Sequence, residues 1–261
     1  MNDVSRYLPL SQRAPVDETG VSGDWRPLIS DSLTLVANLL AALPQDRWNS
    51  PSLCAGWTVR ETTGHLVWII SSTRREVLSG VIRTCLRKRI SPFAAIDTLS
   101  RETAQHDPME LIRLLRELAE SRLAGIGRRG ITDLTEVIVH GYDLAVALAL
   151  PMSFSPVATG AVAIARASRA PAETRALLRA RIFAATDAGW AVGRGTPLAA
   201  PAAVLIPRLF GRTLPAPNEV PAPKAVPAEL PTDMPTALPA ALPAALPTDM
   251  PTDLPPAETP E

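Results

Sequence analysis

Apolar residues recur with a helical period in the first long segment of the chain. Between Trp25 and Leu43 they stand at positions 28, 29, 33, 35, 36, 39, 40 and 43. This spacing makes one broad stripe at 3.6 residues per turn, so it predicts an amphipathic helix that ends before Pro44. A second helix is predicted from about Val59 to Leu78, because Thr58 and Glu61 have the spacing of a capping box.

Two further helices are predicted downstream of an irregular stretch. Asp107 and Pro108 form a helix start, with Asp as the capping residue and Pro at the first helical position, leading into residues 111–123. Glycines interrupt the pattern there, and a fourth helix is predicted from about Thr132 to Leu150. Four amphipathic helices of this kind predict a mainly α protein built on a four-helix bundle. Residues 79–105 are less regular, and their basic cluster is interpreted as a solvated face or a loop: Arg83, Arg87, Lys88 and Arg89.

The pattern changes after Pro151. One or two short, Ala-rich helices are predicted in residues 156–180, then two short strands at 181–187 and 189–193, then a last helix from Leu198 to Phe210. Four parts are therefore expected along the chain. They are an N-terminal extension (1–24), the metal-binding four-helix bundle (25–150), a small C-terminal α/β region (151–214) and a disordered Pro-rich tail (215–261).

The tail has a composition of its own. Fourteen of the 27 prolines lie in residues 215–261, and from Pro231 to Pro255 every fourth residue is proline. Proline fixes φ and removes a hydrogen-bond donor, so an extended, polyproline-like and disordered segment is expected. The tail carries seven acidic residues and one basic residue, which leaves 25 bases and 19 acids in residues 1–214. We interpret it as a spacer, with recruitment of a partner through its repeated Leu and Met residues as the alternative.

Composition excludes several classes of protein. The basic excess of residues 1–214 is small and scattered, so binding to nucleic acid is not expected. Two cysteines, Cys54 and Cys85, exclude a disulfide scaffold and favour a reducing compartment. Residues 1–23 lack the pattern of a signal peptide, and no stretch approaches the ~20 apolar residues of a membrane helix. The sequence therefore predicts a soluble, cytoplasmic protein that does not bind membranes.

Candidate chemistry centres on two of the three histidines. His65 lies in the second predicted helix and His140 in the fourth, where Glu136 precedes it by four residues and shares its face. A carboxylate and an imidazole at this spacing can bind one cation, with a third ligand from a facing helix. Asp143 lies on the same face, where it can accept the second N–H of His140 and orient its ring.

Three alternatives stay open at this point. The spacing can arise from composition alone, and His65 can be a hydrogen-bonded histidine of the core. Asp133 and Glu136 also have the spacing of a capping box, in which Glu136 would only cap the fourth helix.

Two blocks of the sequence resemble a known family. Residues 48–66, WNSPSLCAGWTVRETTGHL, are similar to the N-terminal signature of the mycothiol-dependent maleylpyruvate isomerase family, whose members are DinB-like helical bundles. Residues 135–145, TEVIVHGYDLA, resemble the fourth-helix motif of that family. Residues 185–195 and 206–212 show a weaker likeness to its small C-terminal part. The resemblance covers roughly residues 25–214.

The resemblance implies a metal site and a thiol cofactor. By this likeness, a divalent ion, usually zinc, would be held by His65, Glu136 and His140. In the family, the open coordination position accepts the thiol of mycothiol, a low-molecular-weight thiol of actinobacteria, which the metal deprotonates to a nucleophile. The implied function is that of a metal-dependent and mycothiol-dependent isomerase or thiol transferase, whose partners are this thiol and a small electrophilic substrate.

Two other functions are weighed against this one. The bundle can be a non-catalytic metal-binding or interaction scaffold whose Pro-rich tail recruits a partner, or a small-molecule binder with an empty site. For the enzyme, Arg208 or Arg212 is a candidate to recognise a substrate carboxylate. Cys54 is interpreted as a packing residue, since it precedes the second helix among apolar residues and no activating group is evident nearby.

Overall fold

A computed structural model describes residues 23–214 of the protein. The predicted N-terminal extension, apart from its last two residues, and the predicted disordered tail lie outside the described residues. Within them, nine α-helices precede, flank and follow a three-stranded sheet. The mainly α fold with a small C-terminal α/β part is therefore confirmed. Among the described helices there is none with both the length and the apolar character needed to cross a membrane.

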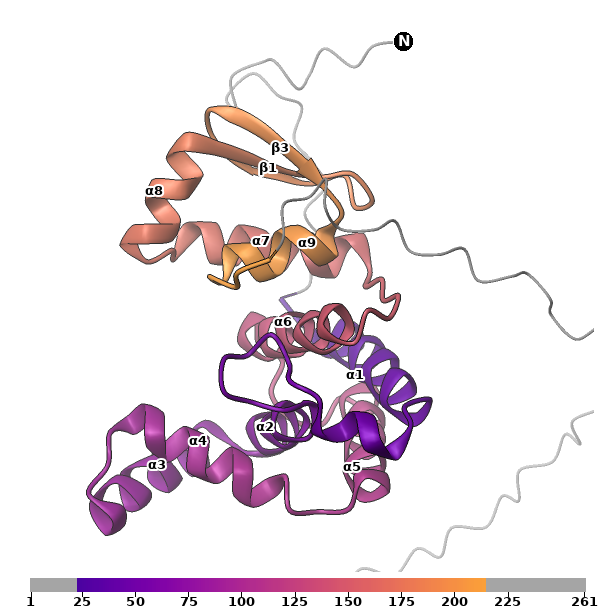
Figure 1. The fold of residues 1–261 in the computed structure, drawn as a ribbon, viewed down its shortest axis with the longest axis vertical. Coiled ribbons are helices and arrows are strands. Elements are labelled where there is room, and N and C mark those ends of the chain that lie inside the picture. The colour runs from indigo at the N-terminus through magenta and orange to yellow at the C-terminus, as the bar shows by residue number, and fades with distance from the viewer. Residues whose placement is uncertain (1–22, 215–261) are drawn as a thin grey trace, which may run out of the picture. The chain divides into compact units, whose positions relative to one another are not determined.

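Four helices form a bundle around one apolar core (Figure 1). They are α1 (Arg26–Ala41), α2 (Val59–Ser71), α5 (Pro108–Leu123) and α6 (Ile131–Ala147). Each turns an aliphatic stripe inward, and these side chains lie almost completely out of contact with solvent: Ile29, Leu33, Leu66, Ile70, Leu111, Leu115, Leu134 and Ile138. Burial of each such side chain contributes on the order of 1.5–3 kcal/mol, so this core is the main source of the bundle's stability.

The stretch between α2 and α5 differs from the prediction. α2 ends at Ser71, and a second capping box formed by Thr73 and Glu76 starts α3 (Arg74–Lys88), which α4 (Pro92–Thr103) follows. The prediction of one helix reaching Leu78 was wrong, and so was the interpretation of residues 79–105 as irregular. The basic residues of this stretch lie on the exposed face and at the end of α3, so the solvated face is correct and the loop is not.

The C-terminal part joins three helices to a small sheet. α7 (Pro156–Ser168) and α8 (Ala172–Ala180) confirm the predicted short helices, and β1 (Arg181–Ala185) pairs antiparallel with β2 (Ala191–Gly193) as the predicted strands. β3 (Thr196–Ala200) was not predicted, and it pairs in parallel with β1. Because Leu198 pairs with Phe183 in this ladder, α9 (Ala202–Leu209) starts later than the predicted Leu198. α7 and α9 lie beside α6 and connect the sheet region to the bundle (Figure 1).

Candidate metal centre

Two bundle helices bring the three predicted ligands together. α2 supplies His65, and α6 supplies Glu136 and His140. Oε2 of Glu136 lies 3.5 Å from Nε2 of His65 and 3.4 Å from Nε2 of His140. One donor atom from each residue falls within 4.8 Å of the other two. Both imidazoles are buried, whereas Glu136 is partly exposed, so the cluster has one side that faces solvent.

The ring of His65 is fixed by a residue of α4. Oγ of Ser100 donates its hydrogen to the carbonyl of Ile96 at 2.7 Å, and Nδ1 of His65 lies 3.0 Å from the same oxygen. Since the hydroxyl has only one hydrogen, Ser100 accepts from Nδ1–H of His65. The remaining lone pair of the imidazole is then on Nε2, which faces Glu136.

The ring of His140 is fixed from the opposite direction. Oδ2 of Asp143 lies 3.1 Å from Nδ1 of His140, the contact that their shared helix face allows. Arg212 holds the same carboxylate with two bonds, from Nε to Oδ1 at 2.9 Å and from Nη2 to Oδ2 at 2.8 Å. Burial opposes ionisation of Asp143, but the hydrogen bonds from His140 and Arg212 lower its pKa to about 2. An ionised Asp143 accepts the Nδ1–H of His140, so Nε2 is the nitrogen of this ring that faces Glu136, where it can carry either a proton or a metal ion.

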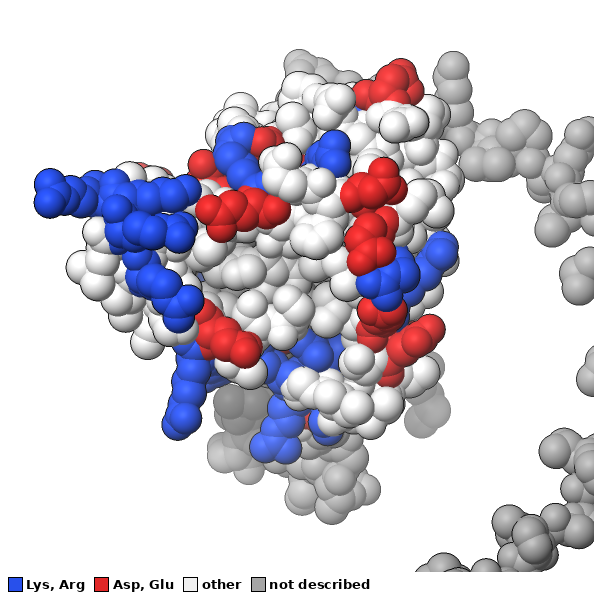
Figure 2. All heavy atoms as spheres, turned by 90° about the horizontal axis from the view of Figure 1, so that it is seen from below, with Lys and Arg blue, Asp and Glu red and all other residues white. Residues whose placement is uncertain are grey.

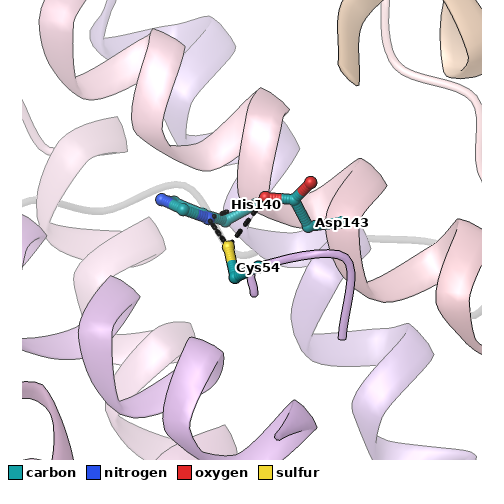
Figure 3. Close-up of side chains that lie close together, drawn as sticks. All are labelled: Cys54, His140 and Asp143. Carbon is teal, nitrogen blue, oxygen red and sulfur yellow. Dashed lines mark hydrogen bonds and ion pairs between the residues drawn. The ribbon is translucent and has the colours of Figure 1, made fainter. Parts of the chain in front are cut away.

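Cys54 belongs to the same network. Its Sγ donates to Oδ2 of Asp143 at 3.0 Å and lies 3.3 Å from Nδ1 of His140, as Figure 3 shows. Nη2 of Arg212 lies 3.4 Å from the sulfur. The premise that no activating group lies near Cys54 was therefore wrong. Cys54, His140 and Asp143 could together surround a cation, but the guanidinium of Arg212 already supplies the positive charge to Asp143, so we interpret this group as a hydrogen-bond network.

The orientation of both rings makes the cluster a receptor for positive charge. Two imidazole lone pairs and one carboxylate oxygen converge, and such acceptors repel one another unless a cation or a proton lies among them. Burial lowers the pKa of His65 against the opposing effect of Glu136. Burial would also lower the pKa of His140, but Asp143, Cys54 and Glu136 outweigh it and raise that pKa well above the ordinary value. The two imidazoles lower the pKa of Glu136, although burial alone would raise it.

Indole rings form part of the wall of the cluster. The ring of Trp57 lies 5.0 Å from that of His65 and 6.4 Å from that of His140, and Trp68 lies 6.0 Å from His65. Nε1 of Trp57 donates to Oδ1 of Asp97 on α4 at 2.6 Å, which holds the indole in place. These rings keep water away from one side of the ligands and lower the local dielectric constant.

Two expectations about neighbouring residues are corrected. The capping box of Asp133 and Glu136 is wrong, because Gly130 is the cap of α6 and Asp133 instead pairs with Arg122 and Arg128. Glu136 is therefore an internal residue of the helix. The guanidinium of Arg212 donates two hydrogen bonds to Asp143, so its partner in the structure is this carboxylate and not the carboxylate of a substrate.

The sequence did not indicate that Trp57, Ser100 and Arg212 contact the residues of the metal centre. Trp57 was noticed only as part of the family-like block, and Ser100 carries no local signal at all. Arg212 was considered for a different partner. Ser100 contacts His65, Arg212 contacts Asp143 and Trp57 contacts His140, all far apart in sequence, so only the packing of the helices reveals these contacts.

Comparison with known proteins finds a family that matches part of the bundle. The family described as the mycothiol maleylpyruvate isomerase N-terminal domain matches residues 30–130. This match confirms the resemblance predicted from the sequence for this part of the chain. The matched segment contains His65, Cys54 and Ser100, whereas Glu136 and His140 follow it.

Individual relatives are more distant. An uncharacterized protein of Mycobacterium tuberculosis, present in two strains, is 28% identical over 130 residues, which are 42% of this chain and 51% of the relative. The chain thus spans about half the length of these relatives. Crystal structures of the mycothiol-dependent maleylpyruvate isomerase and of a mutant of it align at 12% identity, with TM-scores of 0.43 and 0.41. Each alignment covers 82% of this chain and 98% of the other.

Proposed function

We propose that this protein is a mycothiol-dependent enzyme in which His65, Glu136 and His140 hold a divalent metal ion, with zinc as the preferred ion. It isomerises a small electrophilic substrate or transfers a thiol to it. The observation that carries the proposal is the convergence of the three ligand atoms, with both imidazoles presenting Nε2 to one carboxylate oxygen. The family match over residues 30–130 supports the thiol and the reaction class.

The donor set and the two distances from Glu136 fit zinc, and the two imidazole nitrogens lie within 4.8 Å of each other. Zinc bonds of about 2.1 Å at tetrahedral angles place two ligand atoms ~3.4 Å apart. The distances from Glu136 to the two imidazoles are 3.5 and 3.4 Å. Two imidazoles and one carboxylate are ligands that zinc accepts, and three protein ligands leave one position for an exogenous group. When bound there, zinc would supply Lewis acidity that lowers the pKa of a thiol.

The chain's own residues prepare this centre. Ser100 and Asp143 each take the Nδ1–H of one imidazole, so neither ring can rotate without losing a hydrogen bond. Arg212 keeps Asp143 ionised and in place. Trp57 excludes water on one side, while the partly exposed Glu136 marks the side from which a thiol and a substrate can approach.

A spectroscopic titration tests the thiol and the metal together. We expect the protein loaded with Co²⁺ to show the absorption of a tetrahedral ion, and mycothiol to add a sulfur-to-cobalt charge-transfer band. The His140→Ala variant should lose both signals. The His106→Ala variant should keep both, because His106 is exposed and its Nδ1 bonds to the carbonyl of Thr103 outside the cluster.

Turnover separates the enzyme from a scaffold. Isomerisation of maleylpyruvate or thiol addition to a related electrophile should require both the metal and mycothiol. Metal binding without a thiol band or turnover would contradict the enzyme and leave a metal-binding scaffold. Thiol-dependent turnover that survives in His140→Ala would contradict the assignment of the ligands.

A further inference from the structure

One face of α3 exposes a regular apolar stripe. Leu78, Ile82 and Leu86 are spaced by four residues and are 62%, 49% and 76% exposed. The opposite face carries Thr84, which is buried, and the helix packs against α4, which in turn packs against α2 (Figure 1). Where α3 passes into α4, the ring of Phe93 is 85% exposed. Isolated exposed apolar residues are common, but a stripe of three aliphatic residues in register with an aromatic ring at its end is not.

Basic side chains surround the stripe. Residues 74–89 contain six basic residues and one acidic residue. At 3.6 residues per turn the bases stand on both flanks of the stripe and beyond each of its ends: Arg83 and Arg87 on one flank, Arg74 and Lys88 on the other, and Arg75 and Arg89 at the ends. Figure 2 shows Lys and Arg side chains gathered on the side of the molecule formed by α3.

Little of this positive charge is neutralised within residues 23–214. Of the six bases, Lys88 alone has an ion pair there, with Glu102 at 3.5 Å on the exposed surface. The acidic residue of the helix, Glu76, caps the helix start by accepting the backbone N–H of Thr73 at 2.6 Å. The field of the bases is therefore directed into solvent. A partner for this face should combine an apolar medium for the stripe with negative charge all around it.

We propose that this face of α3, with Phe93, docks the protein on an anionic lipid surface. The stripe would enter the boundary between headgroups and acyl chains, while the bases reach the phosphate and carboxylate groups on every side. The groove of a protein partner would have to supply acidic residues opposite both flanks and both ends of one helix, whereas an anionic bilayer presents such charge in every direction. The sequence predicted no membrane partner because no segment is long enough to span a bilayer, but a helix that lies in the interface needs no such segment.

Co-sedimentation of the full chain with vesicles tests the proposal without metal, thiol or activity. Its failure is therefore distinguishable from failure of the proposed enzyme. We expect binding to vesicles of phosphatidylcholine with about 30% phosphatidylserine and none to vesicles of phosphatidylcholine alone. About 0.5 M NaCl shortens the Debye length to about 4 Å, so it should weaken binding about tenfold or more. Absence of binding to the anionic vesicles, or equal binding to the neutral ones, would overturn the proposal.

Paired charge variants test whether α3 makes the contact. Each base near an anionic surface strengthens binding about fivefold, so Arg83→Gln with Arg87→Gln should weaken it about 25-fold. Arg175→Gln with Arg179→Gln is the matched control, because this pair has the same spacing on α8 and is also exposed. The control should bind within about twofold of the wild type. An equal loss in both pairs would assign the binding to overall basic charge and overturn the role of α3.

The apolar stripe has a test of its own. Leu78→Gln with Leu86→Gln should weaken binding about tenfold or more, because two side chains no longer leave water. Leu123→Gln with Ile164→Gln, at exposed positions of α5 and α7, should bind as the wild type does. A benzophenone amino acid at position 86 should crosslink to lipid acyl chains in light, and one at position 123 should not. Full binding by the Leu78→Gln and Leu86→Gln variant would overturn insertion of the stripe, and crosslinks between chains in place of lipid would favour a second copy as the occupant.

Discussion

Ser100 offers a test of the metal centre that leaves every proposed ligand in place. Its side chain lies fully buried in α4, where Oγ receives Nδ1–H of His65 at 3.0 Å and donates to Ile96 at 2.7 Å. The Ser100→Ala change removes one oxygen atom and leaves helix propensity favourable. Nδ1–H of His65 then has no acceptor in the described contacts, and the hydrogen can move to Nε2, where it opposes a metal ion.

The structure allows an estimate of the effect. Loss of the hydrogen-bond partner of a metal-ligating histidine lowers metal affinity by about 10–100-fold. This range corresponds to about 1.4–2.8 kcal/mol of binding free energy. The free energy of unfolding should fall by about 1–3 kcal/mol, because a buried polar group loses its partner.

Competition for Zn²⁺ with a chromophoric chelator measures the affinity, and urea denaturation measures the stability. Thr98→Ala is the matched control. Oγ1 of Thr98 donates to the carbonyl of Ala94 at 2.8 Å on the same helix, and this hydrogen bond does not involve His65. This control should lose stability and keep its zinc affinity. A folded Ser100→Ala protein that binds zinc within twofold of the wild type would refute the role assigned to Ser100.

Three further predictions follow from the contacts around the centre. A Cβ at Gly64 would lie 2.7 Å from the amide nitrogen of Ala104. Gly64→Ala should therefore push α4 away from α2, lower the free energy of unfolding by about 1–3 kcal/mol and weaken zinc binding. An unchanged melting temperature and an unchanged zinc affinity would contradict this. Arg212→Met leaves the buried Asp143 without its guanidinium, so urea denaturation should show a loss of about 3–5 kcal/mol, and a loss below about 1 kcal/mol would argue against a stabilising pair. Zinc at 100 times its Kd should stabilise the fold by about 2.7 kcal/mol, seen in calorimetry as a rise in Tm that a chelator reverses, whereas no rise would count against binding to the folded state.

Much of the bundle could be predicted because its signals are local. The stripes of α1, α5 and α6, and the caps at Thr58 and Asp107, depend on residues within a few positions of each other. The pairing of Glu136 with His140 also follows from helix geometry alone. The break between α2 and α3 was within reach, because Thr73 and Glu76 repeat the spacing of Thr58 and Glu61. It was missed because apolar residues continue across the break.

The remaining features depend on contacts between distant segments. Leu198–Ala200 read as helix because an apolar, Ala-rich run suits either element, and pairing with β1 decides for a strand. The contacts of Ser100 with His65 and of Arg212 with Asp143 join residues 35 and 69 positions apart. No periodicity links such residues. The partners that fix the two imidazoles were therefore the least predictable part of the centre.

The metal content of the purified protein tests the central claim most directly. Elemental analysis by mass spectrometry after dialysis should find about one zinc or other divalent ion per chain of the wild type and of His106→Ala. The His65→Ala, Glu136→Ala and His140→Ala variants, with folding confirmed by circular dichroism, should each lose the ion. A wild-type chain that retains no ion after reconstitution with Zn²⁺, or ligand variants that retain it fully, would contradict the assignment of this cluster as a metal centre.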